Sequence, residues 1–129
     1  MKRKNISSGT KWENSFGYSR AVKIGNLVEI AGTVAVEKDE IVGKGDPYLQ
    51  TRCILEKIKV ALQEAGASLK DVVRTRMFVT DISKWPAVGK AHGEFFKDIK
   101  PVTTLVEVKA LVAPEFLVEI EARAVIGEE

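Results

Sequence analysis

Residues 101–126, PVTTLVEVKALVAPEFLVEIEARAVI, decide the fold of this 129-residue chain. The second half of this stretch alternates between apolar and charged residues, which is the period-two pattern of a strand with one buried face. One side of the predicted strand at 117–126 carries Val118, Ile120, Ala122, Ala124 and Ile126. The other side carries Glu119, Glu121 and Arg123. The strand therefore has one apolar face that fits against a hydrophobic core and a second face that is charged.

Three further segments, at 18–36, 70–80 and 102–112, have the alternation or β-branched content of strands. Gly25-Asn26 in the first segment predicts a hairpin turn, and a weaker strand is predicted at 3–7. In the 102–112 segment we expect the helix-facing side to carry Val102, Thr104, Val106 and Val108. We expect the opposite side to carry Thr103, Leu105, Glu107 and Leu111, beside Arg74, Arg76 and Phe78 of the middle strand.

Two segments predict helices with one apolar stripe each. Asp46-Pro47 supplies an N-cap and a first-turn proline for the first helix, and Gly66 ends it. Its stripe is Leu49, Cys53, Ile54, Ile58, Ala61, Leu62 and Ala65. The second helix is predicted to begin near Ser83 and to end before Pro101. Its stripe is Trp85, Val88, His92, Phe95, Phe96 and Ile99.

The predicted order is β-β-α-β-α-β-β, which defines a single α+β domain over residues 1–129. Its mixed β-sheet has two helices packed on one face. The other face combines leucine, phenylalanine and paired charges. That mixture is too apolar for free solvent and too charged for a core, so we expect it to be covered by other subunits.

The composition of the chain restricts the kinds of partner and cofactor that we expect for it. The formal net charge is only +2 and no basic stripe is visible, which argues against nucleic acid as a partner. No apolar run approaches the ~20 residues of a bilayer span, and the basic N-terminus lacks the apolar core of a signal peptide. The single cysteine, Cys53, fits a reducing cytoplasm and is predicted to be a buried, unreactive thiol. No Cys, His and carboxylate residues have metal-ligand spacing, so neither metal nor cofactor is expected.

The C-terminal stretch closely resembles the signature of the Rid (reactive intermediate deaminase), or YjgF, family, in which a proline-led strand precedes a (V/I)EIEA strand. GYSRAVKIGNLVEIAGTVAV is similar to the N-terminal hairpin of that family and DVVRTRMFVTDIS to its central strand, so the resemblance runs from Tyr18 to Ile126. It implies a chorismate-mutase-like (YjgF-like) fold and a homotrimer with small-molecule clefts between neighbouring subunits. It also implies hydrolysis of 2-imino or enamine acids to 2-oxo acids and ammonia, without metal or cofactor.

The resemblance also implies site residues. Glu119 matches a glutamate that orients the attacking water, and Tyr18 matches a tyrosine that shapes the cleft. Thr103 stands where the family places an arginine that grips the substrate carboxylate. Gly89 replaces an asparagine and Ala31 a serine, so an altered activity or substrate is predicted.

The positions of several other residues in the sequence make them further candidates for the site. Arg20 lies two residues from Tyr18 and offers a replacement guanidinium, and Thr33 ends the same hairpin. Trp12 belongs to an SSGTxWE segment, here residues 7–13, that marks a subgroup of the family, and it is either a pocket wall or a packing aromatic. His92 is either a core residue or a residue at the cleft mouth. Glu107 is predicted on the face of Glu119, and each glutamate serves acid–base chemistry or pairs with an arginine.

Three functions therefore compete. The first is a cofactor-free hydrolase acting on an imine or enamine, with Glu119 as the catalytic residue. The second is a non-enzymatic trimer whose clefts bind or sense a small ligand. The third is an endoribonuclease, an activity with which some family members are labelled, and the near-neutral charge makes it the weakest of the three.

Overall fold

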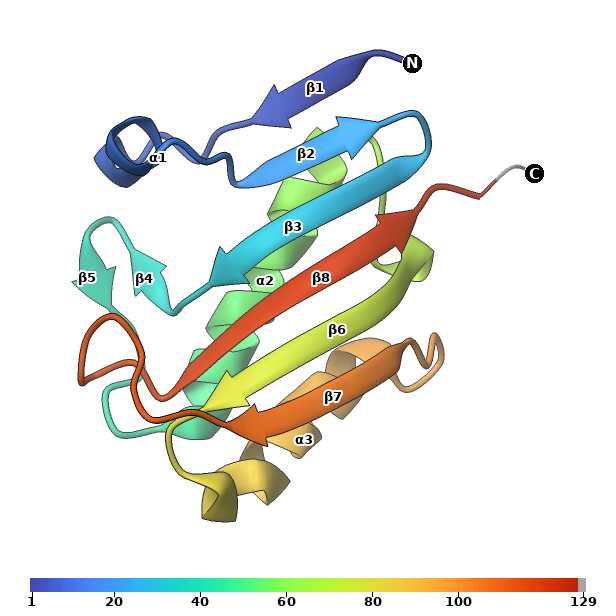
Figure 1. Cartoon of the computed structure of the whole chain (residues 1–129). Coiled ribbons are helices and arrows are strands. Elements are labelled where there is room, and N and C mark those ends of the chain that lie inside the picture. The colour runs from blue at the N-terminus through green and yellow to red at the C-terminus, as the bar shows by residue number, and fades with distance from the viewer. Residues whose placement is uncertain (128–129) are drawn as a thin grey trace.

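The structure is a computed structural model that describes residues 1–127. Six strands form one mixed sheet in the order β1-β2-β3-β8-β6-β7 (Figure 1). Their bounds are β1 Arg3–Ile6, β2 Ala21–Ile24, β3 Leu27–Thr33, β6 Val72–Val79, β7 Val102–Glu107 and β8 Val118–Val125. All neighbours are antiparallel except β6 and β7, which are parallel and joined through a helix. The weak strand predicted at the N-terminus is confirmed as β1.

Two helices, α2 (Pro47–Glu64) and α3 (Trp85–Phe96), cover one face of the sheet, as Figure 1 shows. Asp46 caps α2 by accepting a hydrogen bond from the Leu49 amide at 3.0 Å, and Gly66 follows its end at φ 82°. The apolar side of α2 packs on β3 and β8, where the predicted core side of β8 is buried. Leu49 was wrongly placed in the stripe, because its side chain is 48% exposed.

The second long helix begins later than predicted. A 3₁₀ turn, η2 (Ile82–Lys84), precedes α3, and Ser83 donates from its amide and hydroxyl to the Asp81 carboxylate instead of capping a helix. Trp85 is consequently 60% exposed at the start of α3, whereas Val88 and Phe96 are buried. The predicted stripe was wrong at its first residue, and its last residue, Ile99, lies beyond α3, which ends at Phe96 and not just before Pro101.

Several short elements were not predicted. They are α1 (Lys11–Phe16), the two-stranded β4 (Val36–Glu37) and β5 (Glu40–Ile41), and the 3₁₀ turn η1 (Leu69–Asp71). The six residues of α1, KWENSF, are too few to show an apolar period. β7 also ends at Glu107, five residues before the predicted limit.

The side chains of β7 face opposite directions from those predicted. In the parallel register Thr75 pairs with Thr103 and Met77 with Leu105, and both β6 residues are buried on the helix side. Thr103, Leu105 and Glu107 therefore lie on the helix side, and Val102, Thr104 and Val106 lie on the uncovered face. β7 is an edge strand with threonine, valine and leucine on both sides, so its pattern alone cannot tell the faces apart.

The uncovered face of the sheet combines ion pairs with exposed apolar side chains. Arg123 pairs with Glu29 at 2.9 Å, and Arg76 with Glu121 at 3.7 Å. The apolar side chains around them are Leu27, Val102, Val106 and Val125, which are between 38% and 57% exposed. The predicted mixed character of this face is confirmed, although Leu105 does not contribute to it. Among residues 1–127, no helix combines the length and hydropathy that crossing a bilayer requires.

Candidate functional site

A β-bulge brings the predicted glutamate against a glycine. Ile30 pairs with Ala122 and Thr33 with Ile120, so Ala31 and Gly32 together face one residue of β8. The Glu119 carboxyl group lies directly against Gly32, where a Cβ atom would stand 3.1 Å from the carboxyl carbon and closer still to Oε2. Gly32 thus provides the space that the carboxylate occupies.

Arg20 is fixed beside the bulge. Its Nη1 donates to the Gly32 carbonyl and to Thr33 Oγ1, both at 2.9 Å. The Thr33 hydroxyl in turn donates to the Ala31 carbonyl at 2.8 Å, and the Tyr18 ring centre lies 5.8 Å from Arg20 Cζ. Tyr18, Arg20, Ala31, Thr33 and Glu119, all selected from the sequence, therefore converge at one end of the sheet.

Glu119 is a half-buried acid without an ion-pair partner among residues 1–127. Burial raises the pKa of Glu119, the Arg20 charge counteracts part of that rise, and the nearby Glu121 adds to it. The neighbouring carboxylates Glu29 and Glu121 pair with Arg123 and Arg76 instead. Because its pKa is raised and no ion pair holds it in the charged form, Glu119 is suited to both donating and accepting a proton.

The sequence interpretation missed Glu13, which anchors the segment before Tyr18. Its buried carboxylate accepts hydrogen bonds from the Ser8 amide, at 3.0 Å, and from the Ser8 hydroxyl. Its backbone carbonyl accepts from the amides of Gly17 and Tyr18. Burial alone would raise the pKa of Glu13, but hydrogen bonds from Ser8 and Ser7 and the Arg20 charge outweigh it and lower the pKa. The acid in the SSGTxWE segment was the signal available for this role.

Trp12 lies on α1 with its side chain 54% exposed. Its ring packs edge to face on Phe16 at a centroid distance of 5.9 Å, and Lys11 lies over it at 5.2 Å. These neighbours belong to α1 itself, so the structure does not join Trp12 to the Arg20 cluster.

A second polar group lies on the helix side of the sheet. Thr75 Oγ1 is 2.9 Å from His92 Nε2 and 2.6 Å from Thr103 Oγ1. Thr75 is fully buried, and the His92 ring lies 4.7 Å from the Phe96 ring. Burial lowers the pKa of His92 below its usual 6.5, so the ring is neutral at pH 7. His92 and Thr103 are thus brought together, but on the opposite sheet face from Glu119.

Two predicted residues belong to neither group. Glu107 Oε1 accepts a hydrogen bond from the Ile82 amide at 2.9 Å and so holds the turn before α3. The expectation that Glu107 shares a face and an adjacent strand with Glu119 was wrong, because β6 separates β7 from β8 and Glu107 faces the helices. Gly89 is exposed on α3, and a Cβ built there would meet no atom within 4 Å.

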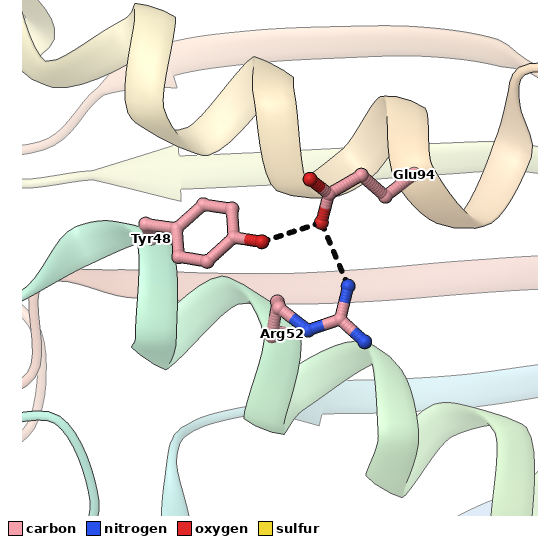
Figure 2. Close-up of polar contacts among 3 residues, drawn as sticks. All are labelled: Tyr48, Arg52 and Glu94. Carbon is pink, nitrogen blue, oxygen red and sulfur yellow. Dashed lines mark hydrogen bonds and ion pairs between the residues drawn. The ribbon is translucent and has the colours of Figure 1, made fainter.

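A third polar cluster joins the two long helices on their outer surface (Figure 2). Tyr48 Oη donates to Glu94 Oε1 at 2.6 Å, and Arg52 Nη1 pairs with the same oxygen at 2.7 Å. The hydrogen bond to Glu94 raises the pKa of Tyr48, and the hydrogen bond from Tyr48 lowers the pKa of Glu94. The phenol therefore stays protonated. The arrangement fits a link between α2 and α3 better than an acid–base pair.

Cys53 is half-buried rather than buried, with Sγ 3.8 Å from Glu37 Oε1. Burial and the nearby Glu37 charge raise the pKa of Cys53, which keeps the thiol protonated. Among the residues that the structure describes, no three His, Cys, Asp or Glu side chains gather as a metal site would require.

A single mixed sheet covered by two helices on one face, with Glu119 beside Arg20 at one end, defines a small α+β protein. The family model described as Endoribonuclease L-PSP matches residues 10–126, and the chain belongs to this family, also known as YjgF or Rid. It is 38% identical to the 3-aminoacrylate deaminase RutC of Acinetobacter baylyi, over 83% of this chain and 85% of the relative.

Solved structures agree with this assignment. A Mycobacterium tuberculosis member of the YjgF/YER057c/UK114 family is 51% identical and superposes with a TM-score of 0.89, covering 97% of this chain and 100% of that one. A Yersinia pestis protein of the Rid family is 28% identical, with a TM-score of 0.84 and the same coverage. The chorismate-mutase-like fold expected from the resemblance is confirmed.

Proposed function

We propose that this protein hydrolyses a small enamine or imine to the corresponding carbonyl compound and ammonia, without metal or cofactor. The observation that carries the proposal is the position of Glu119, half-buried against Gly32, beside Arg20 and without an ion-pair partner among residues 1–127. A deaminase of an enamine acid is among the relatives, and its reaction requires proton transfers of the kind that such a carboxyl group provides.

The reaction begins with protonated Glu119, and the raised pKa increases the fraction of the group in this form. The carbon–carbon double bond of the enamine takes the Glu119 proton, and the nitrogen lone pair completes an iminium ion. Water then attacks the iminium carbon and gives a proton back to the Glu119 carboxylate. In the resulting carbinolamine, Glu119 protonates the nitrogen, the C–N bond breaks, and the hydroxyl proton returns to Glu119 as the carbonyl forms. One water is consumed and one ammonia is released, and the acid is regenerated.

Arg20 is the proposed substrate-orienting residue. Its Nη1 is held by the Gly32 carbonyl and the Thr33 hydroxyl, which leaves other guanidinium N–H groups for a substrate oxygen. The Tyr18 ring beside the guanidinium forms one wall. Because position 103 carries a threonine, we expect 2-iminobutyrate to be hydrolysed more slowly than by a relative with arginine there.

We also propose that the chain forms a homotrimer in which neighbouring subunits cover the uncovered face of the sheet. Exposed valines surround the two ion pairs there, as expected of a subunit interface more than of a solvated surface. RNA cleavage is less well supported. Arg76 and Arg123 on this face pair with Glu121 and Glu29, so Arg74 adds little positive charge there, whereas a phosphate-binding surface needs several unpaired cations.

The test measures ammonia release from 2-imino acids that an amino-acid oxidase generates in the assay. We expect wild-type protein to accelerate release over buffer and Glu119→Gln to abolish the acceleration, because an amide cannot exchange the proton. Glu121→Gln is the matched control on the same strand and face, and it should retain turnover. If wild-type protein accelerates no imine or enamine but is stabilised by a small metabolite in a thermal-shift screen, the protein is a ligand-binding protein and the hydrolase proposal fails.

A further inference from the structure

Lys57 is a half-buried lysine of α2 whose ammonium group contacts the chain segment that follows the β-bulge of β3. Its Nζ donates to the Val34 carbonyl at 3.0 Å and to the Val36 carbonyl at 2.9 Å. Val34 comes directly after Thr33, where β3 ends, and Val36 begins β4. Lys57 therefore ties the end of the bulged strand to the helix that covers it.

The positive charge of Lys57 forms no ion pair among residues 1–127. Burial lowers the pKa of Lys57 below its usual 10.5 and the Arg20 charge lowers it further, whereas Cys53 and Glu37 oppose these effects. Partial burial of a cation that hydrogen-bonds only to carbonyl groups is costly, and an uncharged amide side chain could also donate to two carbonyls. The fold thus keeps a cation where the backbone needs only a donor, and such exceptions concentrate at functional sites.

The segment that Lys57 holds is continuous with the residues that hold Arg20. Arg20 Nη1 donates to the Gly32 carbonyl and to Thr33 Oγ1, and these are the last two residues of β3. The Arg20 charge in turn counteracts part of the rise that burial causes in the pKa of Glu119. A continuous path of contacts therefore leads from Lys57 through the end of β3 and the Arg20 guanidinium to Glu119.

We propose that Lys57 is a positioning residue of the candidate site, which fixes the end of β3 and thereby holds Arg20 beside Glu119. Arg20 and Glu121 are the charged groups that act on Glu119, and Lys57 is not one of them, so its influence passes through Arg20. The expected effect on turnover rests on the proposed hydrolysis. The expected effect on Glu119 itself does not, because it requires no substrate.

The test replaces Lys57 with methionine, which keeps a long unbranched side chain and removes the donors. The ¹³C signal of the Glu119 carboxyl group, identified by its absence in Glu119→Gln, gives the Glu119 pKa in each variant. We expect Lys57→Met to raise the Glu119 pKa above its wild-type value, because Arg20 is no longer held beside the carboxylate. Ammonia release should fall about ten- to a hundredfold.

Two matched variants separate the positioning role from a general effect of charge. Lys57→Arg keeps both the charge and the donors, so it should stay closer to wild type than Lys57→Met in the Glu119 pKa and in turnover. Lys59→Met removes the same charge two residues further along α2, on another side of the helix, and should change neither quantity.

The inference is overturned if Lys57→Met lowers only the Tm and leaves the Glu119 pKa at its wild-type value, because Lys57 would then only stabilise the turn. It is also overturned if Lys59→Met moves the Glu119 pKa as far as Lys57→Met does. If Lys57→Met does not fold, Lys57→Gln, whose donor lies closer to the backbone, takes its place with the same expectation. Wild-type protein that releases no ammonia would refute the proposed hydrolysis alone, since the Glu119 pKa comparison does not depend on turnover.

Discussion

Replacing Gly32 with alanine should displace the Glu119 carboxylate without changing any charge. A Cβ at position 32 would stand 3.1 Å from the Glu119 carboxyl carbon and even closer to Oε2, so the carboxylate must move by about 1 Å. No positive φ is found at Gly32, so the backbone accepts alanine. The atoms that must move are the end of a flexible side chain. We therefore expect the folded state to survive while the reactive group is misplaced.

The expected magnitudes differ for stability and for turnover. Forcing Glu119 off its preferred rotamer costs about 0.5–1.5 kcal/mol, which alanine partly offsets by restricting the unfolded chain. A net loss near 1 kcal/mol corresponds to a fall of about 4 °C in Tm for a chain of this length. A misplacement of about 1 Å in a catalytic group lowers the rate about a hundredfold.

The assay combines ammonia release with thermal unfolding on the same samples. Gly127→Ala is the matched control, because a Cβ there would meet no atom within 4 Å. Unchanged turnover in Gly32→Ala would show that the position of Glu119 does not matter and would refute the proposed site. A loss of Tm far beyond about 4 °C would instead show that Gly32 is needed for the bulge itself.

Three further predictions test other parts of the structure. Burial raises the pKa of Glu119 above its ordinary 4.5, so the stability that this group contributes is complete below 4.5 and is lost as the pH rises through the raised value. The Tm of Glu119→Gln minus that of wild type should therefore increase from pH 4 to pH 8, and a flat or falling difference would contradict the buried, unpaired acid. Val106→Glu should dissociate the proposed trimer, as measured by light scattering, because Val106 lies on the uncovered face. The control Val112→Glu, in an exposed loop, should leave the trimer intact. A monomeric wild-type protein would refute the interface. Glu94→Gln should leave turnover unchanged and lower the pKa of Tyr48, measured by ultraviolet titration, because the carboxylate that stabilises the protonated phenol is gone; an unchanged Tyr48 pKa would count against the link between the helices.

Elements whose residue pattern fits only one arrangement could be predicted from the sequence. The alternation in β8 admits one orientation over a core, and Asp46, Pro47 and Gly66 mark both ends of α2. β7 had no such constraint. Its faces are set by the parallel register with β6, which depends on how α3 connects the two strands. Ser83 and Asp81 are both good cap residues, so the sequence could not choose between them.

The candidate site could be predicted as a set of residues but not as a geometry. Tyr18, Arg20 and Glu119 were selected from the sequence, yet their convergence depends on the bulge at Ala31 and Gly32. Bulges follow from strand register and leave little trace in local propensity. Glu13 was overlooked for a similar reason, because its burial results from the fold of the loop that contains Ser8.

The polar group around Glu119 and the polar group around Thr103 lie on opposite faces of one sheet. Glu119 pairs in register with Phe78 on the uncovered face, whereas Thr103 pairs with Thr75 beneath α3, and β6 lies between their strands. One chain therefore cannot offer both groups to one small molecule. A ligand that contacts both must lie between two copies, with the edge strand β7 of one copy near the Arg20 and Glu119 cluster of the next. In that case a monomeric Val106→Glu would lose turnover although every residue of both groups is intact. Turnover that survives in the monomer would show that Glu119 and Arg20 suffice without Thr103 of a second copy.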